Sequence, residues 1–182
     1  MFFVGKKNEK KRMVQDYQYL NKGTVKNNYL LPLISNLINT MGTKRVFTKI
    51  DLQWGYNNMQ MKEGDEWKTT FMTHLGVYEP IVMFFSLTNS LAIFQTMINN
   101  ILRDLINTEE VAAFMDNVLV GTEEKEKHDK IVKEVLRKME ENDLYIKLEK
   151  CVWKVREIDF LGLVMGLGGI KMQKEKIAGV LE

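Results

Sequence analysis

Two apolar runs in the chain each carry an acidic residue that a buried strand would not tolerate. Residues 45–52 read as a strand that ends on Asp51. Residues 113–120 hold Asp116 near their centre, followed at once by Asn117. Burying an unpaired carboxylate inside a sheet would cost several kcal/mol. We therefore predict that residues 113–120 form a strand–turn–strand with Asp116 at its tip.

Three longer segments have apolar residues at three- and four-residue spacing, which is typical of amphipathic helices. The first follows Pro32 and stops before Gly42, residues that favour a helix start and a helix end. The second is preceded by Ser86 and Thr88, and either hydroxyl can cap a helix N-terminus. The predicted helices cover residues 33–41, 91–105 and about 124–142.

Further strand-like segments complete an alternating order of strands and helices. Residues 13–17 and 150–162 have strand character. Residues 69–73 and 77–83 read as a hairpin. From residue 45 onward the order is strand, helix, strand–turn–strand, helix, strand. This order predicts an α+β fold with a split β-α-β unit, an antiparallel sheet with helices on one face. On such a sheet the two aspartate-bearing strands can lie side by side.

Composition narrows the class of protein without identifying it. The 182 residues fit one domain or two small lobes, and 45% hydrophobic with 27% charged residues is ordinary for a globular protein. Cys151 is the one cysteine, which excludes an internal disulfide, and with only His74 and His128 it argues against a structural zinc site. The sequence has no signal-peptide core and no apolar run near the roughly 20 residues of a membrane span. We expect an intracellular protein, cytoplasmic or nuclear, that is not secreted and has no membrane partner.

Positive charge is concentrated near the start of the chain. The net charge of +2 is too small to indicate nucleic-acid binding by itself. Within residues 6–28, however, only Glu9 and Asp16 oppose a cluster of cations, and such clusters supply sequence-independent affinity for nucleic-acid phosphates. A solvated turn and linker is the alternative, and the sequence leaves both open. The cations are Lys6, Lys7, Lys10, Lys11, Arg12, Lys22 and Lys26.

The two aspartates indicate a metal site. Carboxylates, waters and substrate phosphates are the oxygen ligands that Mg²⁺ favours. Asp51 and Asp116 would present their carboxylates from the ends of neighbouring strands, an arrangement that nucleotidyl transfer uses. Aspartate is seldom buried in apolar strands without a partner, so we predict that these two residues belong to a functional site.

Six blocks of the chain form an ordered series: RMVQDYQYLN at 12–21, FTKIDLQWGY at 47–56, EGDEWKTTF at 63–71, LTNSLAIFQ at 87–95, FMDN at 114–117 and FLG at 160–162. The series resembles reverse transcriptases, above all the polymerase of gypsy-type LTR retrotransposons, over about residues 3–170. The resemblance implies one reverse transcriptase domain fragment over residues 1–182. Its fingers would cover about 1–45 and 60–85, and its palm about 46–59 and 86–170. We expect the thumb and RNase H regions of such enzymes to be absent.

The resemblance implies RNA-directed DNA polymerase activity, in which dNTPs are added to a primer 3′-hydroxyl on an RNA or DNA template. Asp51 and Asp116 match the aspartates that bridge two Mg²⁺ ions, with Mn²⁺ as an alternative, and Asn117 completes the catalytic set. In such a site one ion lowers the pKa of the primer hydroxyl and the other neutralises the triphosphate.

Contacts to nucleotide and primer follow from the same resemblance. Tyr56 matches the aromatic gate that would clash with a ribose 2′-hydroxyl, and Gly55 lies where backbone N–H groups would cradle the triphosphate. Without the resemblance, Tyr56 and Phe85 would be interpreted as structural aromatics. The implied dNTP-binding residues are Lys6, Arg12, Trp54, Gly55, Tyr56 and Phe85, and the implied primer grip is Phe160, Leu161 and Gly162.

The chain departs from the family pattern where the chemistry resides. The family has two adjacent aspartates, and Asn117 replaces the second. At about 4 Å a unit charge is worth roughly 4 kcal/mol to another at an effective dielectric of 20. Losing that much stabilisation would slow a reaction roughly a thousandfold. Two prolines and a glycine of the family are replaced by Phe84, Leu91 and Ser86. We expect impaired activity; the alternatives are an inactive nucleic-acid-binding module or a non-functional element remnant.

Overall fold

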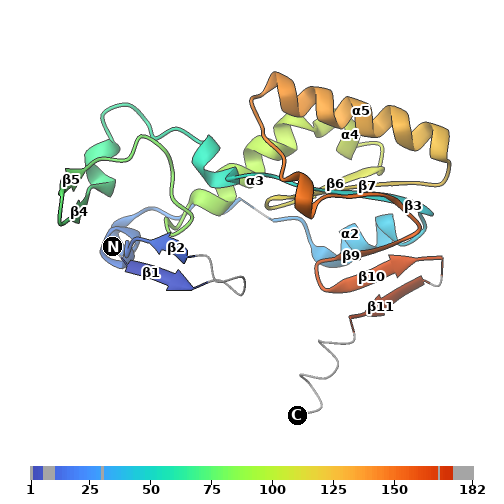
Figure 1. Cartoon of the computed structure of the whole chain (residues 1–182), viewed down its shortest axis with the longest axis horizontal. Helices are drawn as coiled ribbons and strands as arrows, with labels where there is room; N and C mark the ends of the chain where they lie inside the picture. The colour runs from blue at the N-terminus through green and yellow to red at the C-terminus, as the bar shows by residue number, and fades with distance from the viewer. Residues whose placement is uncertain (1, 6–10, 30, 168, 174–182) are drawn as a thin grey trace, which may run out of the picture. The chain divides into compact units, whose positions relative to one another are not determined.

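The chain divides into two compact units, each made of two segments of the sequence. The computed structural model describes residues 2–5, 11–29, 31–167 and 169–173 (Figure 1). The first unit comprises Met1–Tyr29 and Trp54–Phe94. The second comprises Leu30–Gln53 and Gln95–Glu182.

The first unit is built from short hairpins and short helices. Its elements are β1 (Phe2–Gly5), β2 (Lys11–Val14), α1 (Gln18–Gly23), the 3-10 helices η1 (Gly55–Asn58) and η2 (Glu66–Thr69), β4 (Phe71–Thr73), β5 (Gly76–Tyr78) and the start of α3 (Ser90–Ile101). β1 pairs with β2, and β4 pairs with β5, both antiparallel. The hairpin predicted over residues 69–73 and 77–83 is confirmed, although each strand has only three residues.

The second unit contains two antiparallel sheets. Its elements are α2 (Ile34–Met41), β3 (Val46–Asp51), the rest of α3, α4 (Arg103–Ile106), β6 (Val111–Phe114), β7 (Asn117–Thr122), α5 (Lys125–Glu141), η3 (Leu148–Lys150), β8 (Val152–Val155), β9 (Glu157–Phe160), β10 (Leu163–Gly166) and β11 (Gly169–Met172). The strand orders are β6-β7-β3-β8 and β11-β10-β9. These pairings confirm the predicted α+β fold, and β3 lies beside β7 as expected.

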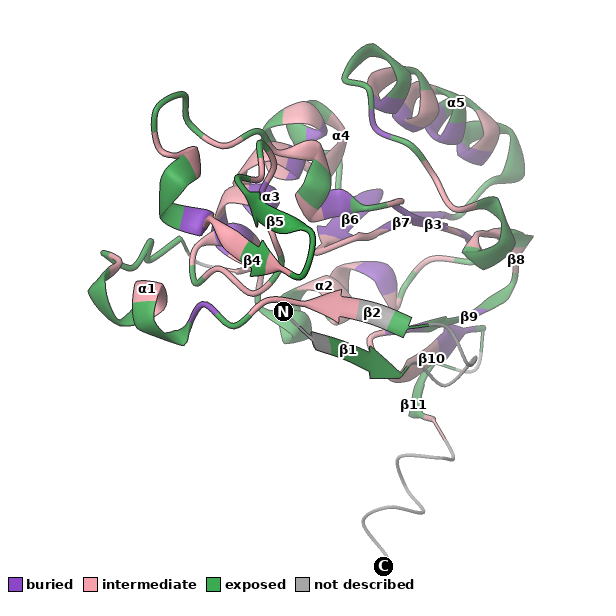
Figure 2. Ribbon diagram, turned by 60° about the vertical axis from the view of Figure 1, so that its left-hand side comes forward, coloured by how far each residue is buried: buried purple, intermediate pink, exposed green. Residues whose placement is uncertain are grey.

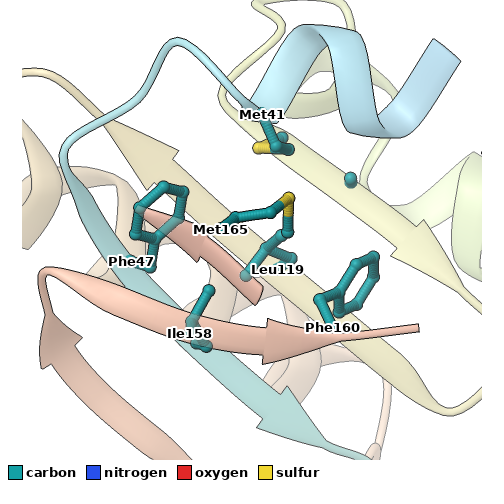
Figure 3. Close-up of a cluster of buried hydrophobic side chains, with 7 residues drawn as sticks. Met41, Phe47, Leu119, Ile158, Phe160 and Met165 are labelled. Carbon is teal, nitrogen blue, oxygen red and sulfur yellow. The ribbon is translucent and has the colours of Figure 1, made fainter. Parts of the chain in front are cut away.

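The two faces of the four-stranded sheet have different partners, because successive side chains on a strand point to opposite faces. One face meets α5, whose Val135 and Met139 are buried as the helical spacing predicts. On the other face, Phe47 and Leu119 pack against Met41 of α2 and against β9 and β10 (Figure 3). The strands between these layers are the most buried part of the unit (Figure 2). The cluster in Figure 3 comprises Met41, Phe47, Ala112, Leu119, Ile158, Phe160 and Met165.

The predicted N-caps of the second helix are wrong, because α3 begins only at Ser90. A long-range contact explains the difference. Asn21 donates its side-chain N–H to the carbonyl of Ser86 at 2.9 Å and accepts from the backbone N–H of Thr88 at 2.8 Å. These bonds stabilise a turn where the sequence alone would allow a helix to start. The helix also stops at Ile101, and a separate α4 covers the rest of the predicted span.

The strand predicted over residues 13–17 is only partly right. β2 ends at Val14, and Tyr17 instead lies buried with its hydroxyl donating to the carbonyl of Thr69 at 2.8 Å. Burial raises the pKa of Tyr17 to about 12. The strand character predicted at residues 150–162 is confirmed by β8 and β9. Within the described part of the chain, no helix is long and apolar enough to cross a membrane.

Candidate functional site

Asp51 and the Asp116–Asn117 pair come together because β3 and β7 are neighbours in register. Asp51, the last residue of β3, lies opposite Asn117, the first residue of β7. Phe114 pairs with Asn117 across the β6–β7 hairpin, so Met115 and Asp116 form its two-residue loop. Met115 has φ 56°, the left-handed conformation that such tight hairpins require. Asp116 therefore lies at the tip of the strand–turn–strand, as predicted.

The Asp51 side chain is held close to both a cation and a second carboxylate. The residue is 9% exposed, and Lys150 Nζ lies 3.6 Å from its Oδ2. Burial raises the pKa of the Asp51 carboxyl, Lys150 opposes the rise, and the nearby charge of Asp116 adds to it. When a buried carboxylate lies near a second carboxylate, a further positive charge stabilises its ionised form. The sequence did not single out Lys150.

Asn117 places a neutral amide beside the two aspartates. Its Nδ2 donates a hydrogen bond to Asp116 Oδ1 at 3.2 Å. An aspartate at this position would instead add a negative charge beside Asp116. Among the described residues no group of three or more histidine, cysteine, aspartate or glutamate side chains is placed to bind a metal ion. The described residues at this point therefore offer two carboxylates, where the family pattern that the sequence resembles has three.

The donor chemistry of the site fits a hard divalent cation. Asp51 and Asp116 offer carboxylate oxygens from adjacent strand ends, and magnesium completes its coordination with waters and substrate phosphates. The backbone around them is fixed, because the Leu52 N–H donates to the Asp116 carbonyl at 2.7 Å and the Lys147 N–H donates to the Asp51 carbonyl at 2.8 Å. Asn117 can add an amide oxygen but no charge.

The predicted triphosphate turn lies in the first unit, where packing already explains one of its residues. Trp54 is 72% exposed and left-handed at φ 50°, and it precedes η1. Gly55 is buried, and a Cβ added there would lie 2.8 Å from Cζ of Phe94. Tyr56 also packs on the Phe94 ring, with centroids 5.4 Å apart. Glycine at position 55 is therefore needed for close packing, and a role toward the triphosphate stays a prediction.

The other predicted nucleotide contacts are described to different extents. Phe85 is 41% exposed, so it is not a core residue. Next to it, Ser86 Oγ is buried with no hydrogen-bond partner in the described structure. Arg12 lies in β2, paired with Val4. Lys6 lies outside the described residues.

The predicted primer grip coincides with the tight turn between β9 and β10. Leu161 and Gly162 both have positive φ, 53° and 81°, and β9 and β10 pair on either side of them. Phe160 is 3% exposed and belongs to the cluster of Figure 3, so its side chain has a structural role. Leu161 and Gly162 are both half-buried.

One residue near the aspartates has no role in the sequence-based prediction. Gln95 of α3 is fully buried, and its side chain bonds to the backbone of the β6–β7 hairpin. Its signal in the sequence was a polar residue among the apolar positions of a predicted helix.

Transposon polyproteins and viral reverse transcriptases resemble this chain over nearly its whole length. The Transposon Tf2-7 polyprotein of Schizosaccharomyces pombe is 36% identical over all 182 residues, and the chain spans 14% of that protein's length. A foamy viral protease-reverse transcriptase in complex with double-stranded DNA has a similar structure, with a TM-score of 0.91 and 21% sequence identity. The match covers 99% of this chain and 31% of the viral chain. A foamy viral protease-reverse transcriptase in complex with an RNA/DNA hybrid gives a TM-score of 0.88 at 20% identity. That match covers 99% of this chain and 24% of the viral chain. These structures share the fold.

The family comparison covers most of the chain. Residues 4–165 match the family described as reverse transcriptase (RNA-dependent DNA polymerase). With the transposon relatives, this match confirms the predicted resemblance to the reverse transcriptase of a gypsy-type LTR retrotransposon polyprotein. The chain belongs to the reverse transcriptase family.

Proposed function

We propose that this chain is the fingers and palm of an RNA-directed DNA polymerase, and that Asn117 impairs its catalysis. The observation that carries the proposal is the placement of Asp51 and Asp116 at the ends of adjacent antiparallel strands. The first unit would be the fingers and the second the palm. Compared with the bounds expected from the sequence, this assignment moves residues 30–45 to the palm and residues 54–59 and 86–94 to the fingers.

In the proposed reaction the palm presents the carboxylates and the fingers position the nucleotide. Asp51 and Asp116 would hold two divalent cations, which when bound lower the pKa of the primer hydroxyl and neutralise the triphosphate. Tyr56 and Phe85 would select and stack the dNTP, with Trp54 and Gly55 at its triphosphate. Lys6 and Arg12 would add positive charge there. The turn at Phe160, Leu161 and Gly162 would align the primer end.

Asn117 impairs this reaction by removing charge while preserving shape. Its amide keeps the position opposite Asp51 and satisfies Asp116 Oδ1, so the hairpin retains its conformation. The lost unit charge is worth roughly 4 kcal/mol at about 4 Å. The chain would therefore keep substrate affinity and lose rate, roughly a thousandfold.

Primer extension with purified chain tests this function. A labelled DNA primer on an RNA template is incubated with dNTPs and Mg²⁺ or Mn²⁺, beside the Asp116→Asn variant as the matched control. We expect weak extension by the natural chain and none by D116N. Equal residual extension by both proteins would show that the activity does not come from this site and would refute the proposal.

The missing third carboxylate also favours a second candidate, a nucleic-acid-binding module without catalysis. The exposed Lys11, Lys22 and Lys26 support it. This candidate predicts binding of a primer–template that weakens steeply with salt and does not respond to Asp116→Ala. Salt-independent or absent binding would exclude it. A non-functional remnant is the remaining alternative, and it predicts neither binding nor extension.

A further inference from the structure

Gln95 makes hydrogen bonds that reach from α3 to the hairpin that carries Asp116. Its side chain is 0% exposed. Its Oε1 accepts from the backbone N–H of Met115 at 2.8 Å, and its Nε2 donates to the carbonyl of Ala113 at 3.0 Å. Nε2 also donates to Asn99 Oδ1, one turn along α3, at 2.9 Å.

The partners fix the orientation of the Gln95 amide. The Met115 N–H can only donate, so the atom facing it must be the carbonyl oxygen. The Ala113 carbonyl can only accept, so the atom facing it must be the amino group. A flipped amide would lose both bonds inside the core, where unsatisfied polar groups are costly. Only a side chain with a donor and an acceptor side by side can bond to the Ala113 carbonyl and the Met115 N–H at once.

The residue that Gln95 holds is in an unusual conformation. The backbone of Met115 is left-handed at φ 56°, a conformation that residues other than glycine, asparagine and aspartate seldom adopt. Such a conformation persists only where the surroundings hold it in place. The β6–β7 pairs on one side and Gln95 on the other provide that support. Asp116 is the next residue, so the direction of its carboxylate depends on this turn.

We propose that Gln95 is a positioning residue that fixes the Met115–Asp116 turn and thereby aims the Asp116 carboxylate. It acts through the backbone and does not touch substrate. The expected effect of Gln95 on metal binding rests on the proposed function, whereas its effect on the turn does not.

Three variants test the proposal. Gln95→Met keeps the length of the side chain and loses every hydrogen bond. Gln95→Glu is the conservative rescue, because a protonated carboxyl also has an acceptor and a donor side by side, and burial favours that form. Ile98→Ala, in the same helix and equally buried, is the control for lost core packing alone.

The first readout is amide hydrogen exchange, with Met115 measured relative to Leu119 in the same protein so that global stability cancels. We expect Q95M to lower the relative protection of Met115 about tenfold, the worth of one buried hydrogen bond. Q95E should recover most of that loss, and I98A should leave the ratio unchanged. An unchanged ratio in Q95M, or an equal loss in I98A, would overturn the proposal.

The second readout is Mn²⁺ affinity, measured by electron paramagnetic resonance without substrate. Loss of a supporting residue behind a ligand typically weakens metal binding about tenfold, so we expect that change in Q95M and not in I98A. Lost Met115 protection with unchanged affinity would overturn the aiming role. If the natural chain binds no Mn²⁺, or D116A binds it equally well, the proposed function fails and the exchange ratio alone decides the role of Gln95.

Discussion

At the scale of single residues, packing and chemistry make competing demands on the same positions. Gly55 was predicted to let the backbone approach a triphosphate, and it also faces the ring of Phe94. Phe160 was predicted in the primer grip, and its side chain is in the core. The family pattern identified both positions, Gly55 at the start of η1 and Phe160 at the end of β9. It could not tell which part of the residue, backbone or side chain, is available for function.

Gly55→Ala separates these demands. The added methyl would meet Phe94 Cζ at 2.8 Å, closer than a real contact allows, so we expect about 1–3 kcal/mol of destabilisation from overpacking. The measurement is urea denaturation followed by circular dichroism. Gly23→Ala is the matched control, because nothing lies within 4 Å of its added Cβ. If G55A and G23A were equally stable, the packing role of Gly55 would be wrong.

At the scale of elements, α5 is tied to the sheet by a buried polar network. His128 is fully buried, with Nε2 2.7 Å from Thr48 Oγ1 of β3 and Nδ1 3.0 Å from Thr122 Oγ1 of β7. Thr122 donates its own hydroxyl proton to the Glu124 carbonyl, so it must accept from Nδ1–H. Nε2 of a neutral ring then accepts from Thr48. In the neutral ring both nitrogens are satisfied, whereas protonation would place a charge in a buried site and leave the Thr48 hydroxyl proton without this acceptor.

Acid should weaken this network. Burial lowers the pKa of His128 below its ordinary value near 6.5, so between the two values the unfolded chain binds the proton and the folded one does not. The stability that His128 contributes is present above about pH 6.5 and is lost as pH falls toward the folded pKa. We expect the free energy of unfolding to drop between pH 7.5 and pH 5.5.

Two substitutions assign that drop to one ring. The chain has only one other histidine, His74, and it is exposed. His128→Gln should be less stable at pH 7.5 and should lose most of the pH dependence in this window. His74→Gln should behave like the natural chain. A drop that survives in H128Q would show that other groups cause it.

Elements with local signals were predictable, and those set by distant contacts were not. β3, the β6–β7 hairpin and α5 follow from apolar spacing and lie where expected. The start of α3 was missed because Asn21, far away in sequence, bonds to Ser86 and Thr88. Gln95 and Lys150 were missed for the same reason, since their partners become neighbours only in the folded sheet.

At the scale of the whole molecule, chain length left one domain or two small lobes open, and composition could not locate the boundaries between the two units. The chain crosses between the units at residues 29–30, at residues 53–54 and inside α3 at residues 94–95. None of these points has a proline- or glycine-rich linker. In the sequence, Asp51 lies just before the second crossing, and Gln95 is the first residue after the third. The transposon relatives are much longer, and the chain spans 14% of Tf2-7. The activity proposed here concerns this part alone.

The central claim is that the site is intact except for the charge missing at Asn117, and Asn117→Asp tests it most directly. The measurement is the rate of single-nucleotide addition to a primer on an RNA template with Mg²⁺, for the natural chain and for N117D. The restored charge predicts a rate increase of about a hundredfold to a thousandfold, abolished again when Asp51→Asn is added. Fast extension by the natural chain, or no increase in N117D, would contradict the claim.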